Sequence, residues 1–383
     1  MTKIYLIRHA EAEGNLYRRV QGHSNSDVTP RGWRQIAALA ERFRDIPLDA
    51  IYSSDLYRTR MTATALTKYH DLPVTARKDL REMHLGAWEN MAWGNVQHDE
   101  PEMLRNFSFA PDDWIVPGAE RFSELGARMV KAVTEIAEAH PGETVAVVSH
   151  GMALRTLLFE ILRLPVSEIG TLGHADNTSV SLLHYENGAF TVEFKNDNSH
   201  LSAPGLSTFA TQTWWKSNSG AENNNLRLIP LDISCEKELY CQCYASAWEA
   251  AHGSLEGFYP EVYWQKACAQ ARRDPETLMK AYAGDTFVGV VELDKRRAAL
   301  YKAGWISLLY IVPEHRRRGF SLQLIGHAIH VFRPLGRKTL RLCVSEDNVN
   351  AIGLYEHLNF KKIGEEKAAT GRLFLMEKDI RLE

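Results

Sequence analysis

The chain has 383 residues, which is long for one ordinary domain and favours two. With 45% apolar and 24% charged residues it has the composition of a globular protein, and its net charge of −3 gives no electrostatic reason to expect nucleic acid or an anionic membrane as a partner. No apolar run approaches the ~18 residues of a membrane-spanning helix. Basic residues do cluster locally, so small anionic ligands remain candidates.

The cysteines favour a cytoplasmic protein without disulfides. They are odd in number, form no framework and all lie in the second half, at Cys235, Cys241, Cys243, Cys268 and Cys343. Cys241 and Cys243 stand two apart on a predicted helix, so they do not share a face and make a poor metal pair. The N-terminus enters a strand pattern without the regions of a signal peptide. We therefore expect packing cysteines, a cytoplasmic location and no metal.

The first half alternates strand-like and helix-like segments. Strands are predicted at 3–9, 50–55 and 143–150, and helices at 29–46 (with Thr29 as its cap), 56–70, 121–140 and 151–164. Such alternation implies a mostly parallel sheet with helices on both faces. Residues 179–195 differ, because Asn187-Gly188 between two strand patterns is a hairpin signal at a sheet edge.

Ser, Asn and Gly dominate the segment from about 199 to 225, which indicates an interdomain connector. We place it at 201–225, between domains at 1–200 and 226–383. Exposed paired tryptophans would be costly, so we expect Trp214-Trp215 to pack against one or both domains.

The second half has an α+β pattern. Strands are predicted at 226–232, 276–284, 287–294, 305–312 and 339–345, with helices at 235–252 and from about 321, followed by a short helix and two final strands. A basic turn, "PEHRRRGF", stands between the strand at 305–312 and the helix that follows it.

Polar residues of one chemical theme follow several strands of the first half. Arg8-His9 and His150 stand at strand ends, and Arg58 lies at the start of the helix after another strand. Ligands of parallel α/β sheets bind at the carboxyl ends of the strands. We therefore expect these side chains to meet in one crevice, and the segment "LREMHLGAWE" adds polar residues of the same kind.

Four motifs, "LIRHAEAEGN", "QGHSNSDVTPRGWRQ", "LREMHLGAWENM" and "VSHGMALR", resemble the histidine phosphatase family, also called phosphoglycerate mutase-like, over about residues 1–200. Three positions depart from its usual pattern: Ala10 for Gly, Val28 for Leu and Asn90 for Gly. The resemblance implies a three-layer α/β/α domain that acts on a small phosphorylated metabolite without a cofactor. It also implies a phosphohistidine intermediate on His9.

The same resemblance implies roles for the other motif residues. Arg8, Arg58 and His150 would hold the phosphoryl oxygens. Glu82 would protonate the leaving group and then take a proton from water. Further candidates for substrate binding are Asn15, Gln21 and Gly22.

Hydrolysis and mutase chemistry both remain open. The segment around "LREMHLGAWENM" looks like the phosphatase members, and the short stretch between Glu82 and His150 also favours hydrolysis, since a mutase must keep its intermediate dry. Arg18 and Arg19 either bind a second anionic group of the substrate or are simply solvated.

The basic turn places backbone N–H groups at the start of a helix, which suits an anionic phosphate. With the downstream "SEDNVNAIGLYEHLNF", it resembles the GNAT acetyltransferase family over about residues 226–383, with Ser321 where that family has Gly or Ala. The resemblance implies that acetyl-CoA is the cosubstrate. Its pyrophosphate would lie on the turn formed by Arg316, Arg317, Arg318, Gly319, Phe320 and Ser321.

The GNAT resemblance also implies that the backbone of Leu309, Tyr310 and Ile311 pairs with the pantetheine arm and that Asn348 helps to hold the coenzyme. Tyr355 would protonate the departing thiolate. The acceptor would be the amine of a small molecule or peptide. The general base stays open between Glu314, Glu292 and water.

The leading hypothesis is therefore a bifunctional enzyme that hydrolyses a phosphomonoester and acetylates an amine. The alternatives are a mutase in the first half, or a second half that binds acetyl-CoA as a regulatory module without acetylating. The sequence predicts neither the identity of the two substrates, nor the oligomeric state, nor the domain arrangement.

Overall fold

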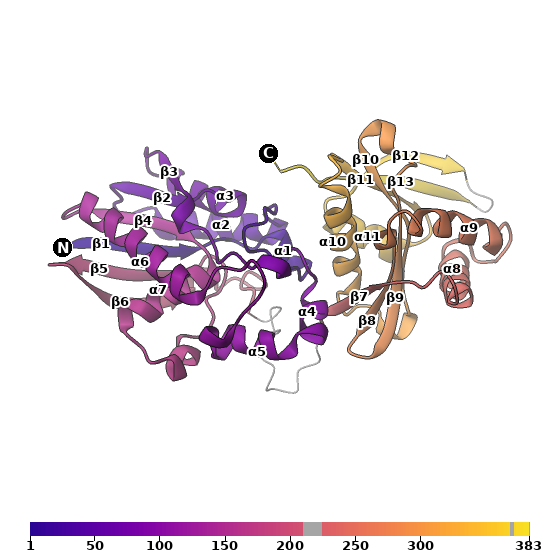
Figure 1. Ribbon diagram of the computed structural model, residues 1–383. Helices are drawn as coiled ribbons and strands as arrows, with labels where there is room; N and C mark the ends of the chain where they lie inside the picture. Colours follow the sequence, from indigo (N-terminus) through magenta and orange to yellow (C-terminus); the bar gives the residue numbers. More distant parts are fainter. Residues whose placement is uncertain (210–223, 368–370, 383) are drawn as a thin grey trace. The chain divides into compact units, whose positions relative to one another are not determined.

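The computed structural model describes residues 1–209, 224–367 and 371–382 (Figure 1). The described chain divides into two compact units, one of residues 1–91 and 99–209 and the other of residues 92–98 and those from 224 onward. The predicted packing of Trp214-Trp215 lies outside the described residues. Within these ranges, no helix has the length and apolar character needed to cross a membrane.

The first unit is built on a six-stranded sheet in the order β3-β2-β4-β1-β5-β6. Strands β1 to β4 pair in parallel, and β5 runs antiparallel to both β1 and β6. This confirms the mostly parallel sheet and the edge hairpin, which turns at Asn187 and Gly188, both with positive φ. The strands are β1 Thr2–Arg8, β2 Ala50–Ser54, β3 Val74–Arg77, β4 Thr144–Ser149, β5 Val180–Glu186 and β6 Ala189–Asp197.

Helices cover both faces of this sheet (Figure 1). Helices α2 and α3 pack on the face into which Ile7, Ile51 and Val148 project, whereas α6 and α7 pack together and contact β1. Helix α2 begins as predicted, with the Thr29 hydroxyl accepting the Gly32 N–H at 3.0 Å. The helices are α1 Glu13–Leu16, α2 Pro30–Phe43, α3 Tyr57–Thr67, α5 Pro101–Phe109, α6 Phe122–Ala139 and α7 Gly151–Leu162; α4, Trp93–Asp99, groups mostly with the second unit.

Residues of the predicted connector pack within the first unit through Asp176, which is fully buried. Its carboxylate accepts hydrogen bonds from the backbone N–H of Thr208, at 3.1 Å, and from the hydroxyls of Thr208 and Ser207. The side chain of the next residue, Asn177, donates to the carbonyl of His9 at 2.9 Å. Residues 207–208 are thus tied to the segment that holds His9.

The second unit is a seven-stranded sheet in the order β12-β13-β11-β10-β9-β8-β7. The strands are β7 Leu226–Pro230, β8 Leu278–Ala283, β9 Thr286–Asp294, β10 Ala303–Ile311, β11 Thr339–Ser345, β12 Lys361–Lys367 and β13 Arg372–Asp379. The helices are α8 Lys237–His252, α9 Pro260–Ala271, α10 Phe320–Phe332 and α11 Val349–His357. Helix α9 was not predicted, although Pro260 at its first position is a helix-start signal.

Strand β10 has two irregular features. Its parallel pairing with β11 spans only Ala303–Trp305, and its antiparallel pairing with β9 shifts register between Ile306 and Leu308. Ser307 stands at this bulge. Such a bulge bends a strand and redirects its side chains, and bulges are common beside functional sites.

Candidate functional site

The strand ends of the first unit bring the predicted phosphate-site residues together. Arg8 of β1 is in register with Ser149 of β4, so His9 and His150 follow directly on neighbouring parallel strands. Both histidines are buried, and their ring centroids are 5.3 Å apart. The His150 Nε2 lies 2.9 Å from the hydroxyl of Ser54, the last residue of β2. Three adjacent strands thus end in one polar crevice, as predicted.

The backbone fixes the ring orientation of His9. Its Nδ1 lies 2.7 Å from the Ala10 carbonyl, which can only accept, so Nδ1 carries the proton and the lone pair is on Nε2. Burial holds the pKa of His9 well below its ordinary value, and the nearby positive charges of Arg58 and Arg8 lower it further. His9 is therefore a neutral imidazole at neutral pH.

The loop after α1 holds the guanidinium group of Arg58 in place. Its two terminal nitrogens donate to the carbonyls of Ser24, at 2.9 Å, and Gly22, at 2.8 Å, and burial lowers its pKa to about 10. Arg8 is anchored in the same way by the Ala175 carbonyl. Both guanidinium groups are thus set before a ligand arrives.

Three buried nitrogens at this crevice have no hydrogen-bond partner among the described residues: Arg8 Nε, Arg58 Nε and His150 Nδ1. Buried polar groups in native proteins are nearly always paired, so unpaired nitrogens beside a neutral histidine suit a site that binds an anion. The pKa of His150 is also held well below its usual value, chiefly by burial and then by Arg58. Two positive charges with few competing acceptors suit a phosphate group.

Glu82 lies at the N-terminus of α7. Its carboxylate accepts the backbone N–H groups of Met152, at 3.1 Å, and Ala153, at 2.8 Å, where the helix dipole favours negative charge. The charges of Arg8 and Arg58 are close enough to interact with it. Glu82 therefore joins the predicted set, half-buried in a loop rather than on a helix surface.

Sequence reasoning missed the residues that hold the Glu82 loop. Arg128 of α6 donates to the carbonyls of Asp79 and Arg81, at 2.8 and 3.0 Å, and pairs with Glu120 at 2.8 Å. Glu89 accepts the backbone N–H groups at positions 23 and 24, within the turn whose carbonyls anchor Arg58. Glu89 lies in the quoted "GAWE" motif, but nothing in the sequence pattern distinguishes Arg128.

The remaining substrate-binding candidates have structural contacts of their own. The Asn15 side chain accepts the Ala12 N–H at 3.0 Å and caps α1. Gln21 accepts the Ser26 hydroxyl at 2.9 Å, and Gly22 supplies the carbonyl behind Arg58. Direct contact of these three with a substrate stays a prediction.

In the second unit, the basic turn leads from β10 into α10. Gly319, with φ +80°, is the N-cap of α10, a conformation that few residues other than glycine adopt. Arg316 donates to the Ile311 carbonyl at 3.1 Å. Asn348 caps α11 by accepting the Ala351 N–H at 3.2 Å, and burial raises the pKa of Tyr355 on that helix to about 12.

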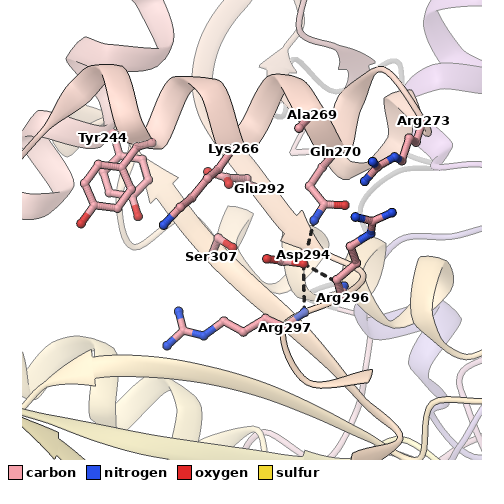
Figure 2. Close-up of a pocket in the computed structure, with 11 residues that line it drawn as sticks. Tyr244, Lys266, Ala269, Gln270, Arg273, Glu292, Asp294, Arg296, Arg297 and Ser307 are labelled. Atoms are coloured by element: carbon pink, nitrogen blue, oxygen red, sulfur yellow. Dashed lines mark hydrogen bonds between the residues drawn. The ribbon is translucent and has the colours of Figure 1, made fainter. Parts of the chain in front are cut away.

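A pocket of about 590 Å³ lies in the second unit, between α8, α9, β9 and β10 (Figure 2). Of the two carboxylates considered as bases, Glu292 lines this pocket, whereas Glu314 is exposed in the turn after β10. Glu292 is only 5% exposed and accepts the Tyr240 hydroxyl at 2.7 Å. Burial raises its pKa to about 7.

Comparison with protein families matches both units. The model of the histidine phosphatase superfamily (branch 1) covers residues 4–198. The chain belongs to the histidine phosphatase superfamily. The acetyltransferase (GNAT) family model covers residues 237–360, so a GNAT domain follows the phosphatase domain. These matches confirm the two family resemblances and the fold class.

Relatives of the histidine phosphatase domain cover about half of this chain. A metal-independent phosphoserine phosphatase of Arabidopsis thaliana is 35% identical over 54% of this chain and 86% of its own length. A probable phosphoglycerate mutase GpmB of Salmonella choleraesuis is 34% identical over 54% of this chain and 98% of its own. The solved structure of Bacillus stearothermophilus YhfR is 32% identical, with a TM-score of 0.51, and covers 52% of this chain and 99% of that one.

Proposed function

We propose that this chain is a bifunctional enzyme whose histidine phosphatase domain hydrolyses a small phosphomonoester and whose GNAT domain acetylates an amine. The observation that carries the first activity is the group of three unpaired buried nitrogens, two of them on arginines, around the neutral His9. The names of the relatives make small phosphorylated acids, such as phosphoserine, the first substrates to test.

The proposed reaction starts with in-line attack of His9 Nε2 on phosphorus, which gives a phosphohistidine. Arg8 and Arg58 bind the phosphoryl oxygens with donors that need no rearrangement. If Ser54 donates its hydroxyl proton to His150 Nε2, His150 keeps a proton on Nδ1 and becomes a third donor to the same oxygens.

Glu82 acts as general acid and then as general base. It first protonates the leaving alkoxide and, once the alcohol has left, takes a proton from the water that attacks the phosphohistidine. Hydrolysis rather than mutase chemistry is proposed because one similar protein is named a phosphatase and because the segment between Glu82 and His150 is short, whereas a mutase must keep water from its intermediate.

For the GNAT domain we propose acetyl transfer from acetyl-CoA. The turn from Arg316 to Ser321 would bind the pyrophosphate, the backbone of Leu309, Tyr310 and Ile311 the pantetheine arm, and Asn348 the coenzyme, with Tyr355 protonating the thiolate. The family match and the position of the turn at the start of α10 support this. We also propose a cytoplasmic location, supported by five free cysteines.

The first test follows phosphate release and phosphoenzyme formation by the full-length protein. His9→Ala should reduce phosphate release by at least ~10⁴-fold and abolish an acid-labile phosphoenzyme, because no other group supplies the nucleophile. The matched control is His184→Asn, a partly buried histidine on β5 that contacts Glu193. Equal rates for wild type and His9→Ala would contradict the proposal, and isomerisation without net phosphate release would favour the mutase.

A further inference from the structure

The pocket in the GNAT unit has the size of a small-molecule site. At about 590 Å³ it falls within the roughly 300–1,000 Å³ typical of such sites. It also reaches Ser307, the residue at the bulge of β10. Since β10 is the strand proposed to carry the pantetheine arm, a molecule in this pocket would lie beside the acetyl group.

A single buried carboxylate faces this pocket. Within the part of the chain that the structure describes, Tyr240 is the one hydrogen-bond partner of Glu292, and it contacts Oε2. Glu292 therefore keeps an acceptor for a ligand in the pocket. Asp294, the other acid, is already engaged: it accepts the Gln270 side chain at 2.7 Å and the backbone N–H groups of Arg296, at 2.8 Å, and Arg297, at 3.0 Å (Figure 2).

Four cations line the same pocket, but they are not equivalent. Arg297 stacks on the Trp305 ring at 3.7 Å and reaches Glu366 at 3.4 Å. Lys266 lies over the ring of Tyr263 at 6.0 Å. Arg273 and Arg296 are exposed, have no ion pair within the described ranges, and lie at the same end of the pocket in Figure 2.

We propose that this pocket binds the acetyl acceptor and that the acceptor is a small primary amine that carries its own carboxylate or phosphate. The ammonium group would lie against Glu292, and the anionic group against Arg273 and Arg296. This inference rests on the proposed acetyl transfer and adds the chemical class of the acceptor.

The charge distribution selects this class. A diamine or polyamine would bring a second cation toward arginines that already carry positive charge, and a neutral amine would leave them unused. A peptide would have to place a chain in a pocket of about 590 Å³, which holds a molecule of amino-acid size more readily. An acceptor with both charges complements both ends of the site.

Glu292 would act as the base in a balanced sequence of steps. It removes one proton from the acceptor ammonium, and the freed lone pair attacks the acetyl carbonyl carbon. The tetrahedral intermediate expels the coenzyme thiolate by breaking the C–S bond. The second nitrogen proton passes to solvent as the amide forms, and Glu292 also releases its proton to solvent. The thiolate gains one proton from Tyr355, which is reprotonated from solvent. The pKa of Glu292 near 7 suits a base that works at neutral pH.

Tyr240 is a positioning residue in this scheme. Its hydroxyl orients the Glu292 carboxylate and lowers the pKa of that carboxyl against the larger effect of burial. Tyr240→Phe should therefore move the acidic limb of the pH–rate profile upward, because Glu292 would then stay protonated to a higher pH. A purely structural role would lower the rate without moving that limb.

The test supplies the full-length protein with acetyl-CoA and three acceptor groups: α-amino carboxylates, amino alkyl phosphates, and amines of similar size without an anion. Thiol release and the mass of the product report acetylation. We expect one of the first two groups to have a kcat/KM at least ~10-fold higher than that of the third. Which of the two anionic groups reacts faster distinguishes a carboxylate site from a phosphate site. Preference for the third group would overturn the inference.

Variants separate the two ends of the pocket. Glu292→Gln should lower kcat by about 100-fold or more while the KM for acetyl-CoA changes little. Arg273→Ala combined with Arg296→Ala should raise the KM of the anionic amine by about 10-fold or more and leave that of an uncharged amine unchanged. The matched control is Arg272→Ala, an exposed arginine outside the pocket lining, which should behave as wild type.

Binding of acetyl-CoA distinguishes failure of this inference from failure of the proposed function. Thermal stabilisation by acetyl-CoA, with no acetylation of any anionic amine, would overturn the inference and leave coenzyme binding in place. If acetyl-CoA neither stabilises the protein nor is consumed, the proposed acetyl transfer itself fails.

Discussion

The two sites of this chain hold their positive charges in different ways. In the histidine phosphatase crevice, Arg58 is 1% exposed and its guanidinium is fixed by two backbone carbonyls. In the GNAT pocket, Arg273 and Arg296 are exposed, and only Glu292 is buried. A buried donor that is already oriented stabilises a transition state without reorganisation. Exposed arginines lose rotamer freedom when they bind, so they contribute more to selection of a substrate than to rate.

The strongest test of this contrast removes a fixed cation from the crevice. Arg58→Met should lower kcat for phosphate release by about 10²–10³-fold, because a preorganised donor to the phosphoryl oxygens is lost. Arg60, two residues later on α3, is exposed, and Arg60→Met is the matched control with an expected rate near wild type. Similar losses in the two variants would mean that general charge, rather than a fixed donor, determines the rate. Melting curves identify any loss caused by unfolding.

Substitution of Glu82 should lower kcat somewhat less than substitution of Arg58, and by an amount that depends on the substrate. Glu82→Gln should lower kcat by about 10²-fold with an alkyl phosphate and far less with p-nitrophenyl phosphate, whose leaving group needs no proton. Glutamine keeps one oxygen, which can accept one of the two α7 amide N–H groups that Glu82 now binds, and melting curves report any loss of stability from the other. Glu102→Gln, on the exposed face of α5, is the control. An equal loss with both substrates would contradict the role of Glu82 as general acid.

The two activities should also differ in their response to pH, because the rate of acetyl transfer should fall by about 10-fold for each pH unit below the pKa of Glu292. The pKa of the proposed nucleophile, His9, lies well below 6.5, so its protonation should not limit phosphate release between about pH 6.5 and 8. The pKa of Glu292 is about 7, and since only the carboxylate accepts a proton, acetyl transfer should fall as the pH drops below that value. This fall at low pH should be absent from the Glu292→Gln variant. The same pH dependence for phosphate release and acetyl transfer would contradict this difference between the two sites.

The sequence predicted the strands and helices that surround the crevice well, because the patterns that indicate them are local in the chain. The apolar run that ends in Arg8-His9 became β1, and Thr29 caps α2. Parallel strands must align their carboxyl ends, so the meeting of His9 and His150 followed from chain order. The residues that support them come from distant segments: Arg128 stands 46 residues from the Glu82 carbonyl that it also contacts. No local pattern predicts such a pair.

The GNAT pocket was harder to predict for a related reason. Helix α9 was missed, and it supplies Lys266 and Gln270 to the pocket. The sequence left the proposed base open between Glu292, Glu314 and water, because the two glutamates are alike as residues and differ only in burial. Glu292 does lie within the apolar run "FVGVVELD", and a carboxylate inside a strand buried on both faces is a signal that could have favoured it.

Asp176 has a consequence for experiments that divide the protein. A fragment cut at residue 200 would retain every motif of the histidine phosphatase family, yet it would lose the hydroxyl and N–H groups of Ser207 and Thr208, which donate three hydrogen bonds to a fully buried carboxylate. Loss of hydrogen-bond donors to a buried carboxylate destabilises a fold by about 1–3 kcal/mol. Its neighbour Asn177 holds the backbone of His9, so the damage would reach the nucleophile. The smallest fragment with a meaningful rate therefore extends past residue 208, beyond the last recognisable family residue.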